Sequence, residues 1–251
     1  MPQFRALRLG QSVILLGLAG VLAGKVLGGS IGFYINPSLA GLTLAAAIGL
    51  VPIGLAAGWA AWRGPPPGHG PADAATRPGP ARWLIAGVLV IPLAIGLLPP
   101  RPLDSAALTG RSVNSGGAGP ASGAAGPAAA GDPRARTIFD WVRAFQQAAG
   151  PAPLASQPVD VTGFVYRDPA GPAPDADYWT VARFTVTCCA ADASGVALTV
   201  RSPGAASLPA DSWVHVVGTL GLETREGETR PVVFADQVTR IPPPADPYLY
   251  P

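Results

Sequence analysis

The sequence is short of charged residues, and that shortage is the first guide to its class. Only 13% of the 251 residues are Asp, Glu, Lys or Arg, whereas 49% are hydrophobic and the mean hydropathy is +0.32. Such a chain is too apolar for an ordinary soluble protein and is typical of a membrane protein. Its two cysteines are too few for a disulfide scaffold. No phosphate-cradling glycine loop, Ser-His-Asp set or carboxylate pair is recognisable, so no enzymatic function is expected.

The few charges are unevenly distributed along the chain. Residues 1–136 hold ten Lys and Arg against three Asp and Glu, whereas residues 137–251 hold seven Arg, no Lys and twelve Asp and Glu. The C-terminal half is therefore acidic. Because nucleic-acid binding depends on neutralising phosphates with basic side chains, the balance argues against a nucleic-acid partner.

Residues 1–100 form the expected membrane region. Three apolar runs, over 11–28, 39–62 and 83–98, are candidate transmembrane helices, with a Pro/Gly-rich loop over 63–82. The third run is short and contains Pro92, so it is either a third span or a re-entrant segment. We therefore expect two or three transmembrane helices.

Basic residues predict the orientation of these helices. They precede the first run and lie in the 63–82 loop, while the loop over 29–38 carries no charge; the residues are Arg5, Arg8, Arg63, Arg77 and Arg82. Cytoplasmic loops are rich in Lys and Arg, so the N-terminus and the 63–82 loop are expected inside. Three crossings then place everything after Leu98 outside the cell membrane. If the third run does not cross, the C-terminal half is cytoplasmic.

Small residues recur at helical spacing in the first two runs. Gly20, Gly24 and Gly28 repeat every four residues, and Gly54 and Gly58 do the same in the second run. Such stripes let a second helix approach closely, although glycine is common throughout this chain. Lys25 near the end of the first run has two interpretations, a functional intramembrane charge or an amine that reaches the interface.

After the membrane region, the composition and residue pattern of the sequence change twice. Residues 101–136 are dominated by Ala, Gly, Pro and Ser and predict a disordered linker. Residues 137–251 predict an all-β domain with a short preceding helix, capped at Thr137. Five strands are expected, over 159–167, 178–189, 196–201, 212–223 and 230–241. They favour a five-stranded OB-like barrel, with a flatter sandwich as the competing fold.

The two cysteines, Cys188 and Cys189, end the second expected strand, and Asp192 follows three residues later. Strand alternation predicts that Cys188 points into the barrel and Cys189 outward. Neighbouring cysteines can ligate one metal ion only if the strand ends or bulges there. With His215 as a nitrogen ligand, the set would suit Zn or Cu. Structural packing, metal binding and thiol redox chemistry all remain open.

Several short segments resemble a known family. They are "FYINP" (33–37), "GFVY" (163–166), "ARFTVTCCAADA" (182–193), "WVHVVGTL" (213–220) and "PYLY" (247–250). They resemble the YcgQ type of proposed bacterial permease subunits, whose C-terminal part is a domain of unknown function. The motif residues in this sequence are Gly163, Phe164, Arg183, Phe184, Ala190, Ala191, Trp213, Gly218, Pro247 and Tyr248.

The resemblance implies a role without supplying a mechanism. Members of the family are thought to pair with a larger multi-spanning permease, in a genetic neighbourhood linked to zinc homeostasis. The resulting hypothesis is an accessory membrane subunit with an extracytoplasmic OB-like domain that handles a metal ion, with zinc as the candidate. A membrane-tethered thiol redox protein and a purely structural scaffold are the alternatives.

Overall fold

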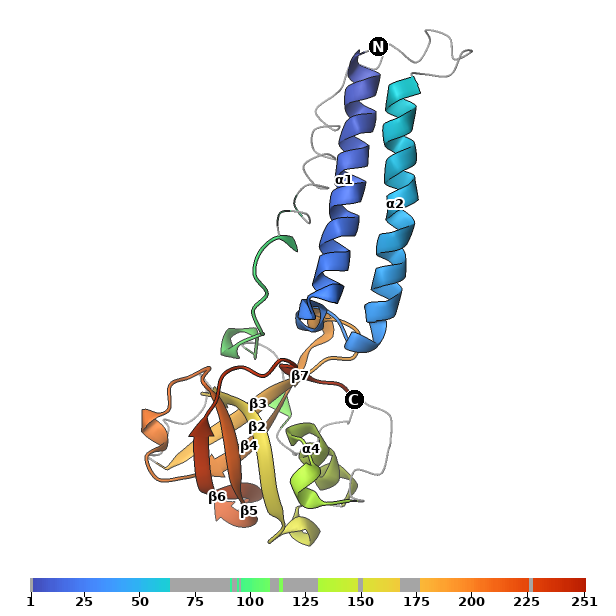
Figure 1. Ribbon diagram of the computed structural model, residues 1–251. Helices are drawn as coiled ribbons and strands as arrows, with labels where there is room; N and C mark the ends of the chain where they lie inside the picture. Colours follow the sequence, from blue (N-terminus) through green and yellow to red (C-terminus); the bar gives the residue numbers. More distant parts are fainter. Residues whose placement is uncertain are drawn as a thin grey trace. The chain divides into compact units, whose positions relative to one another are not determined.

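A computed structural model describes residues 2–63, 91, 94, 96–108, 113–114, 131–148, 151–167, 177–225 and 228–251. The chain divides into two compact units, residues 1–101 and 102–251 (Figure 1). The second unit thus includes the described residues of 102–136 as well as the predicted β domain over 137–251.

The first unit contains two long helices, α1 (Pro2–Leu27) and α2 (Ala40–Arg63). They lie side by side (Figure 1) and are joined by two 3-10 turns, Ser30–Phe33 and Pro37–Leu39. By length and composition, Arg8–Leu27 and Pro37–Arg63 could each cross a membrane. Large apolar side chains such as Leu42, Ile48 and Trp62 are exposed on these helices. An exposed apolar surface of this kind is what a lipid-facing helix needs, so the finding supports membrane association.

The glycines expected at a helix contact are divided between two environments. A Cβ atom added at Gly54 would lie 2.9 Å from Leu16 Cγ, and one at Gly58 would lie 2.9 Å from Ser12 Oγ. The second helix therefore uses its glycines to approach the first. Gly20 and Gly24 have open space instead, and a Cβ atom at Gly28, just after the end of α1, would lie 2.9 Å from the Gly24 carbonyl oxygen. The glycine stripe of α1 does not face α2.

The third apolar run lies largely outside the described residues, namely at 83–90, 92, 93 and 95. Its described end lies beside α1, because the Lys25 Nζ atom donates a hydrogen bond of 3.0 Å to the Leu98 carbonyl oxygen. The same amine lies 5.3 Å from the centre of the Tyr34 ring. Lys25 is thus engaged at the end of its helix by a carbonyl oxygen and an aromatic ring.

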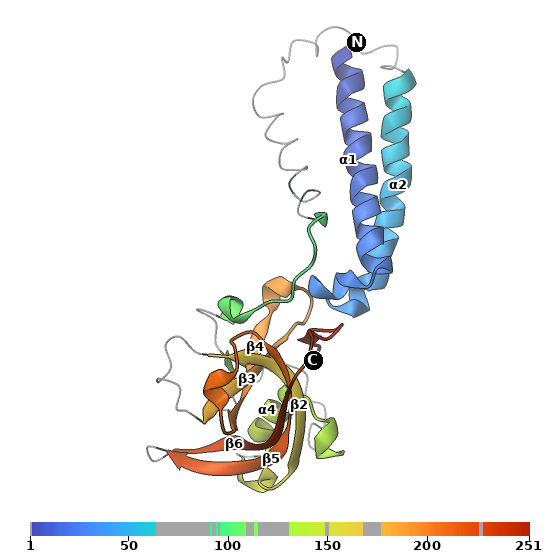
Figure 2. The same ribbon diagram turned by 60° about the vertical axis from the view of Figure 1, so that its left-hand side comes forward.

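The second unit is a closed five-stranded barrel. Its strands are β2 (Pro158–Tyr166), β3 (Tyr178–Thr185), β4 (Ser194–Arg201), β5 (Trp213–Arg225) and β6 (Glu228–Arg240). The pairing runs β2–β3–β4–β6–β5 and returns to β2, with only β4–β6 parallel. This closed order confirms the OB-like barrel and excludes the sandwich. Figure 2 shows the strands curving around the barrel.

Two glycines permit the curvature. The register between β5 and β6 shifts at Val217/Gly218, and a Cβ atom at Gly218 would lie 2.1 Å from the Phe234 carbonyl oxygen. A bulge therefore forms where only glycine fits. At Gly163 a Cβ atom would lie 2.6 Å from the Ala182 carbonyl oxygen, so this glycine lets β2 and β3 approach closely.

Helix α4 (Ile138–Gln147) precedes the barrel and packs against β2, β3 and β4. Thr137 and Asp140 form the capping box that begins it, with the Thr137 hydroxyl oxygen accepting from the Asp140 N–H at 3.2 Å. The expected N-cap is confirmed. Its apolar stripe is fully buried in the barrel core, at Ile138, Trp141, Val142 and Phe145.

The sequence predicted a disordered linker over 101–136, but the described residues of this segment include side chains and a short strand that pack on the barrel. Leu108 is 1% exposed and packs in an aromatic cluster of the barrel. A two-residue strand β1 (Val113–Asn114) pairs with β4, and the Arg136 guanidinium lies 4.8 Å from the Trp141 ring centre. A few anchoring side chains are enough to dock a segment whose composition is otherwise poor in apolar residues. Residues 109–112 and 115–130 lie outside the described ranges.

Candidate functional site

The cysteines lie in a turn and not in a strand. Strand β3 ends at Thr185, and the hairpin with β4 closes at the pair Thr185–Ser194. Between them the chain makes a bend at Thr187 and Cys188 and a short 3-10 helix, Ala190–Asp192. The sequence predicted a strand as far as Cys189. It ends earlier, which meets the geometric condition under which adjacent cysteines can share an ion.

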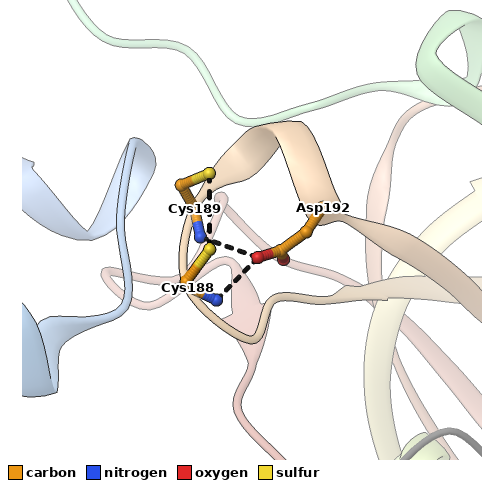
Figure 3. A group of neighbouring side chains, drawn as sticks. All are labelled: Cys188, Cys189 and Asp192. Atoms are coloured by element: carbon orange, nitrogen blue, oxygen red, sulfur yellow. Dashed lines mark hydrogen bonds between the residues drawn. The ribbon is translucent and has the colours of Figure 1, made fainter.

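Asp192 determines the shape of this turn. Its Oδ1 atom accepts a hydrogen bond from the Thr187 N–H at 2.9 Å. Its Oδ2 atom accepts from the N–H groups of Cys188 at 2.7 Å and Cys189 at 3.1 Å (Figure 3). In return, the Asp192 N–H donates to the Cys189 carbonyl oxygen at 2.9 Å. One carboxylate thus collects three consecutive N–H groups, and the extended backbone of β3 cannot continue past them.

The turn brings the two sulfurs together. Cys188 Sγ and Cys189 Sγ are 3.7 Å apart, far beyond the S–S bond length of about 2.05 Å, and both thiols are free. Cys188 is exposed and Cys189 is partly buried. The prediction that Cys188 points into the barrel is wrong, because strand alternation ends at Val186, which is 0% exposed.

The electrostatics of the turn favour a neutral thiol beside an ionised carboxylate. The hydrogen bond to Asp192 is the main cause that raises the pKa of Cys188 from 9.0 to about 11, with a further contribution from Cys189. Burial acts to raise the pKa of Asp192, but hydrogen bonds from the Cys188 thiol and from the three N–H groups outweigh it and lower that pKa to about 2. At neutral pH the Cys188 thiol is therefore a poor nucleophile.

These three residues form a group that could hold a metal ion. One donor atom from each of Cys188, Cys189 and Asp192 lies within 4.8 Å of the other two. The group does not include His215, whose Nε2 atom lies 2.6 Å from Asp160 Oδ1. His215 is on β5, and the barrel order places β2 between β5 and β3. The expectation that His215 approaches the cysteines fails for that topological reason.

Two short strands support the hairpin that carries the turn. β4 meets β6 only at Val200 and Arg201, so the edge of β4 nearer the cysteines would be unpaired. β1 pairs there, at Gly195 and Val196. On the other edge, β7 (Tyr248–Leu249) pairs with β3, and the Val186 N–H donates to the Leu249 carbonyl oxygen at 2.9 Å. Both flanks of the turn are thereby fixed.

Comparison with known proteins identifies the family to which the chain belongs. A model described as the DUF1980 N-terminal domain matches residues 11–114, and one described as the DUF1980 C-terminal domain matches residues 151–251. The chain belongs to this family. The UPF0703 protein YcgQ of Bacillus subtilis (strain 168) is 30% identical over 102 residues, which are 40% of this chain and 35% of that protein. The match thus spans about a third of the relative, and the expected YcgQ-type family is confirmed.

The DUF1980 C-terminal match contains the whole barrel and the turn, whereas β1 belongs to the N-terminal match. Most of the motif residues support the turn and do not enter it. Arg183 donates to the carbonyl oxygens of Asp246 and Pro247, and burial lowers its pKa. Four motif residues form a connected aromatic cluster, with ring centres 5.6 to 6.4 Å apart; they are Phe164, Phe184, Trp213 and Tyr248.

Sequence reasoning missed two features of this site. It treated Asp192 as a metal ligand and overlooked its three backbone hydrogen bonds, although an acid three residues after a polar turn start is a capping signal. It also missed the support from β1 and β7. Two-residue strands leave no pattern in a sequence, so nothing in the residues could have identified them.

Proposed function

We propose that this protein is a non-enzymatic accessory subunit of a membrane permease whose barrel binds a divalent metal ion through the thiolates of Cys188 and Cys189, with the Asp192 carboxylate beside them. Zn²⁺ is the ion that this donor set suits best. The observation that carries the proposal is the grouping of two free thiols and a carboxylate within 4.8 Å of one another. The turn exposes Cys188, so an ion can reach it from solvent.

The spacing of the sulfurs agrees with a tetrahedral ion. With Zn–S bonds of about 2.3 Å, two thiolates on such an ion lie about 3.8 Å apart. The Cys188 and Cys189 sulfurs are 3.7 Å apart. The pair can therefore act as two ligands of one ion with little rearrangement of the turn.

The charge of the turn also suits a cation. The hydrogen bond from the thiol to Asp192 is the main cause that raises the pKa of Cys188 to about 11, and the negative charge of the carboxylate adds to it. A bound metal cation reverses that effect, since a coordinated thiol is deprotonated. Binding then releases protons, and metal affinity should rise with pH. The raised pKa counts against the alternative role as a redox thiol, which needs a readily formed thiolate.

The membrane part of the proposal depends on the two candidate spans. We place the chain in the cell membrane as a multi-pass protein, with the N-terminus inside and the barrel outside. The open face of α1 at Gly20 and Gly24 would accept a helix of the multi-spanning permease partner. This topology requires a third crossing within 83–98. A reporter fused after Pro251 would test it, and activity only on the cytoplasmic side would refute the extracytoplasmic placement.

Metal binding is tested on the full chain purified in detergent. Zn²⁺ affinity is measured for wild type, Cys188→Ser, Cys189→Ser and His215→Ala, each after removal of metal under reducing conditions. We expect both serine variants to lose binding. His215→Ala is the matched control, because the structure keeps His215 with Asp160. Equal binding by all four proteins, or no binding by the wild type, would refute the metal role and leave the barrel as a scaffold.

A further inference from the structure

The donor set of the turn is incomplete for a closed metal site. Structural zinc sites use four protein ligands, whereas sites that exchange a ligand keep a position open. Within the part of the chain that the structure describes, the group has three members only. One of them, Asp192, already accepts three backbone hydrogen bonds. The described residues therefore supply two thiolates and at most one partly engaged carboxylate.

The exposure of the turn indicates where the remaining ligand comes from. Thr187, Cys188, Ala191 and Asp192 are all exposed, while the flanking Val186 and Ala193 are buried. Two of the three donor residues, Cys188 and Asp192, are thus exposed, and Cys189 is partly buried. A structural ion would be expected in the interior, closed off by its own chain, whereas an ion held here is open to another molecule.

We propose that the turn is a transfer site, at which Cys188 and Cys189 hold the ion and a partner protein fills the open position with an imidazole or thiolate side chain. Asp192 acts mainly as a positioning residue that keeps the two sulfurs on one side. The inference rests on the metal binding proposed above and concerns the fate of the ion.

The exchange is balanced in charge and ligands, and no electron is transferred. Binding of a divalent ion deprotonates the two thiols, releases two protons and leaves water in the open position. The incoming nitrogen or sulfur ligand replaces that water. When the ion leaves on the partner, further partner ligands or water replace the Cys188 and Cys189 sulfurs at the ion. The two thiolates then take up two protons from solvent and the turn returns to its metal-free state.

Co²⁺ bound to the full chain in detergent tests the inference, because cobalt reports its ligands spectroscopically and zinc does not. We expect one Co²⁺ per chain, a sulfur-to-cobalt charge-transfer band, and visible bands that shift saturably when imidazole is added. Cys188→Ser and Cys189→Ser should lose the charge-transfer band, and His215→Ala should retain both responses.

The outcomes separate the two proposals. Co²⁺ binding with the thiolate band but no response to imidazole would overturn the transfer site and leave metal binding intact. A stoichiometry of one Co²⁺ per two chains would also overturn the transfer site, because two copies of this protein would then complete the coordination of the ion between them. A wild-type protein without any thiolate band would refute metal binding itself. Asp192→Ala should keep the charge-transfer band while broadening it, whereas its complete loss would make Asp192 a required ligand and contradict the positioning role.

Discussion

Leu108→Ala measures how firmly the segment before the barrel is docked. The side chain is 1% exposed and contacts β4, since a Cβ atom at Gly195 would lie 2.5 Å from Leu108 Cδ2. It shares a buried cluster with Val186 and Ala193, the residues on either side of the cysteine turn. Truncating a fully buried leucine removes its transfer free energy and leaves a cavity. We therefore expect a loss of about 2–4 kcal/mol in the free energy of unfolding.

The assay is urea unfolding of the full chain in mild detergent, followed by tryptophan fluorescence. Ala106→Ser serves as the control, because Ala106 is exposed on the same segment and should change stability by less than about 0.5 kcal/mol. A second readout is alkylation of Cys188, which should become faster when the base of the turn loosens. If Leu108→Ala behaves like the control in both measurements, the segment is a tether and the reasoning is refuted.

Three further predictions concern the turn and the barrel. Asp192→Ala removes the carboxylate that raises the pKa of Cys188 to about 11, so alkylation of that thiol at pH 8 should accelerate by about tenfold or more; an unchanged rate would contradict the assigned cause. The pKa of Asp192 is about 2 in the folded protein against an ordinary value of 3.8, so its ionised carboxylate stabilises the fold above about pH 4 and this contribution is lost as the pH falls towards 2. The pKa of Cys188 is raised from 9.0 to about 11, so the contribution of its neutral thiol is lost as the pH rises from 9.0 towards 11. Urea midpoints measured against pH should therefore fall at both ends, and the acid decline should weaken in Asp192→Ala. Gly218→Ala should lower the free energy of unfolding by about 1–3 kcal/mol, because its Cβ atom would lie 2.1 Å from the Phe234 carbonyl oxygen; thermal unfolding at the wild-type temperature would refute this.

The barrel was predictable because its strands are long and regular. Alternating β-branched and aromatic residues marked all five, and Gly218 within a strand marked the bulge. Strand order left weaker traces in the sequence. His215 was assigned to the cysteines on the assumption that its strand could approach theirs, and only the closed order shows β2 between them.

The cysteine turn was harder to predict because a side chain shapes it and propensity does not. The run from Tyr178 to Cys189 reads as a single strand, and its β-branched residues give no sign of a stop at Thr185. The stop comes from Asp192, seven residues later, through three hydrogen bonds to the backbone. Propensity describes the average residue, so a specific contact of this kind overrides it.

The pairing of β1 with β4 affects how the barrel unit of this protein can be isolated. A fragment beginning at Thr137, where the sequence predicts that the helix and strands of the β domain begin, would lack Leu108 and β1. It would present the bare edge of β4 at Gly195 to other molecules, and exposed strand edges are sites of aggregation. A fragment beginning at Pro102 keeps that edge covered, and it corresponds to the compact unit that carries every strand described.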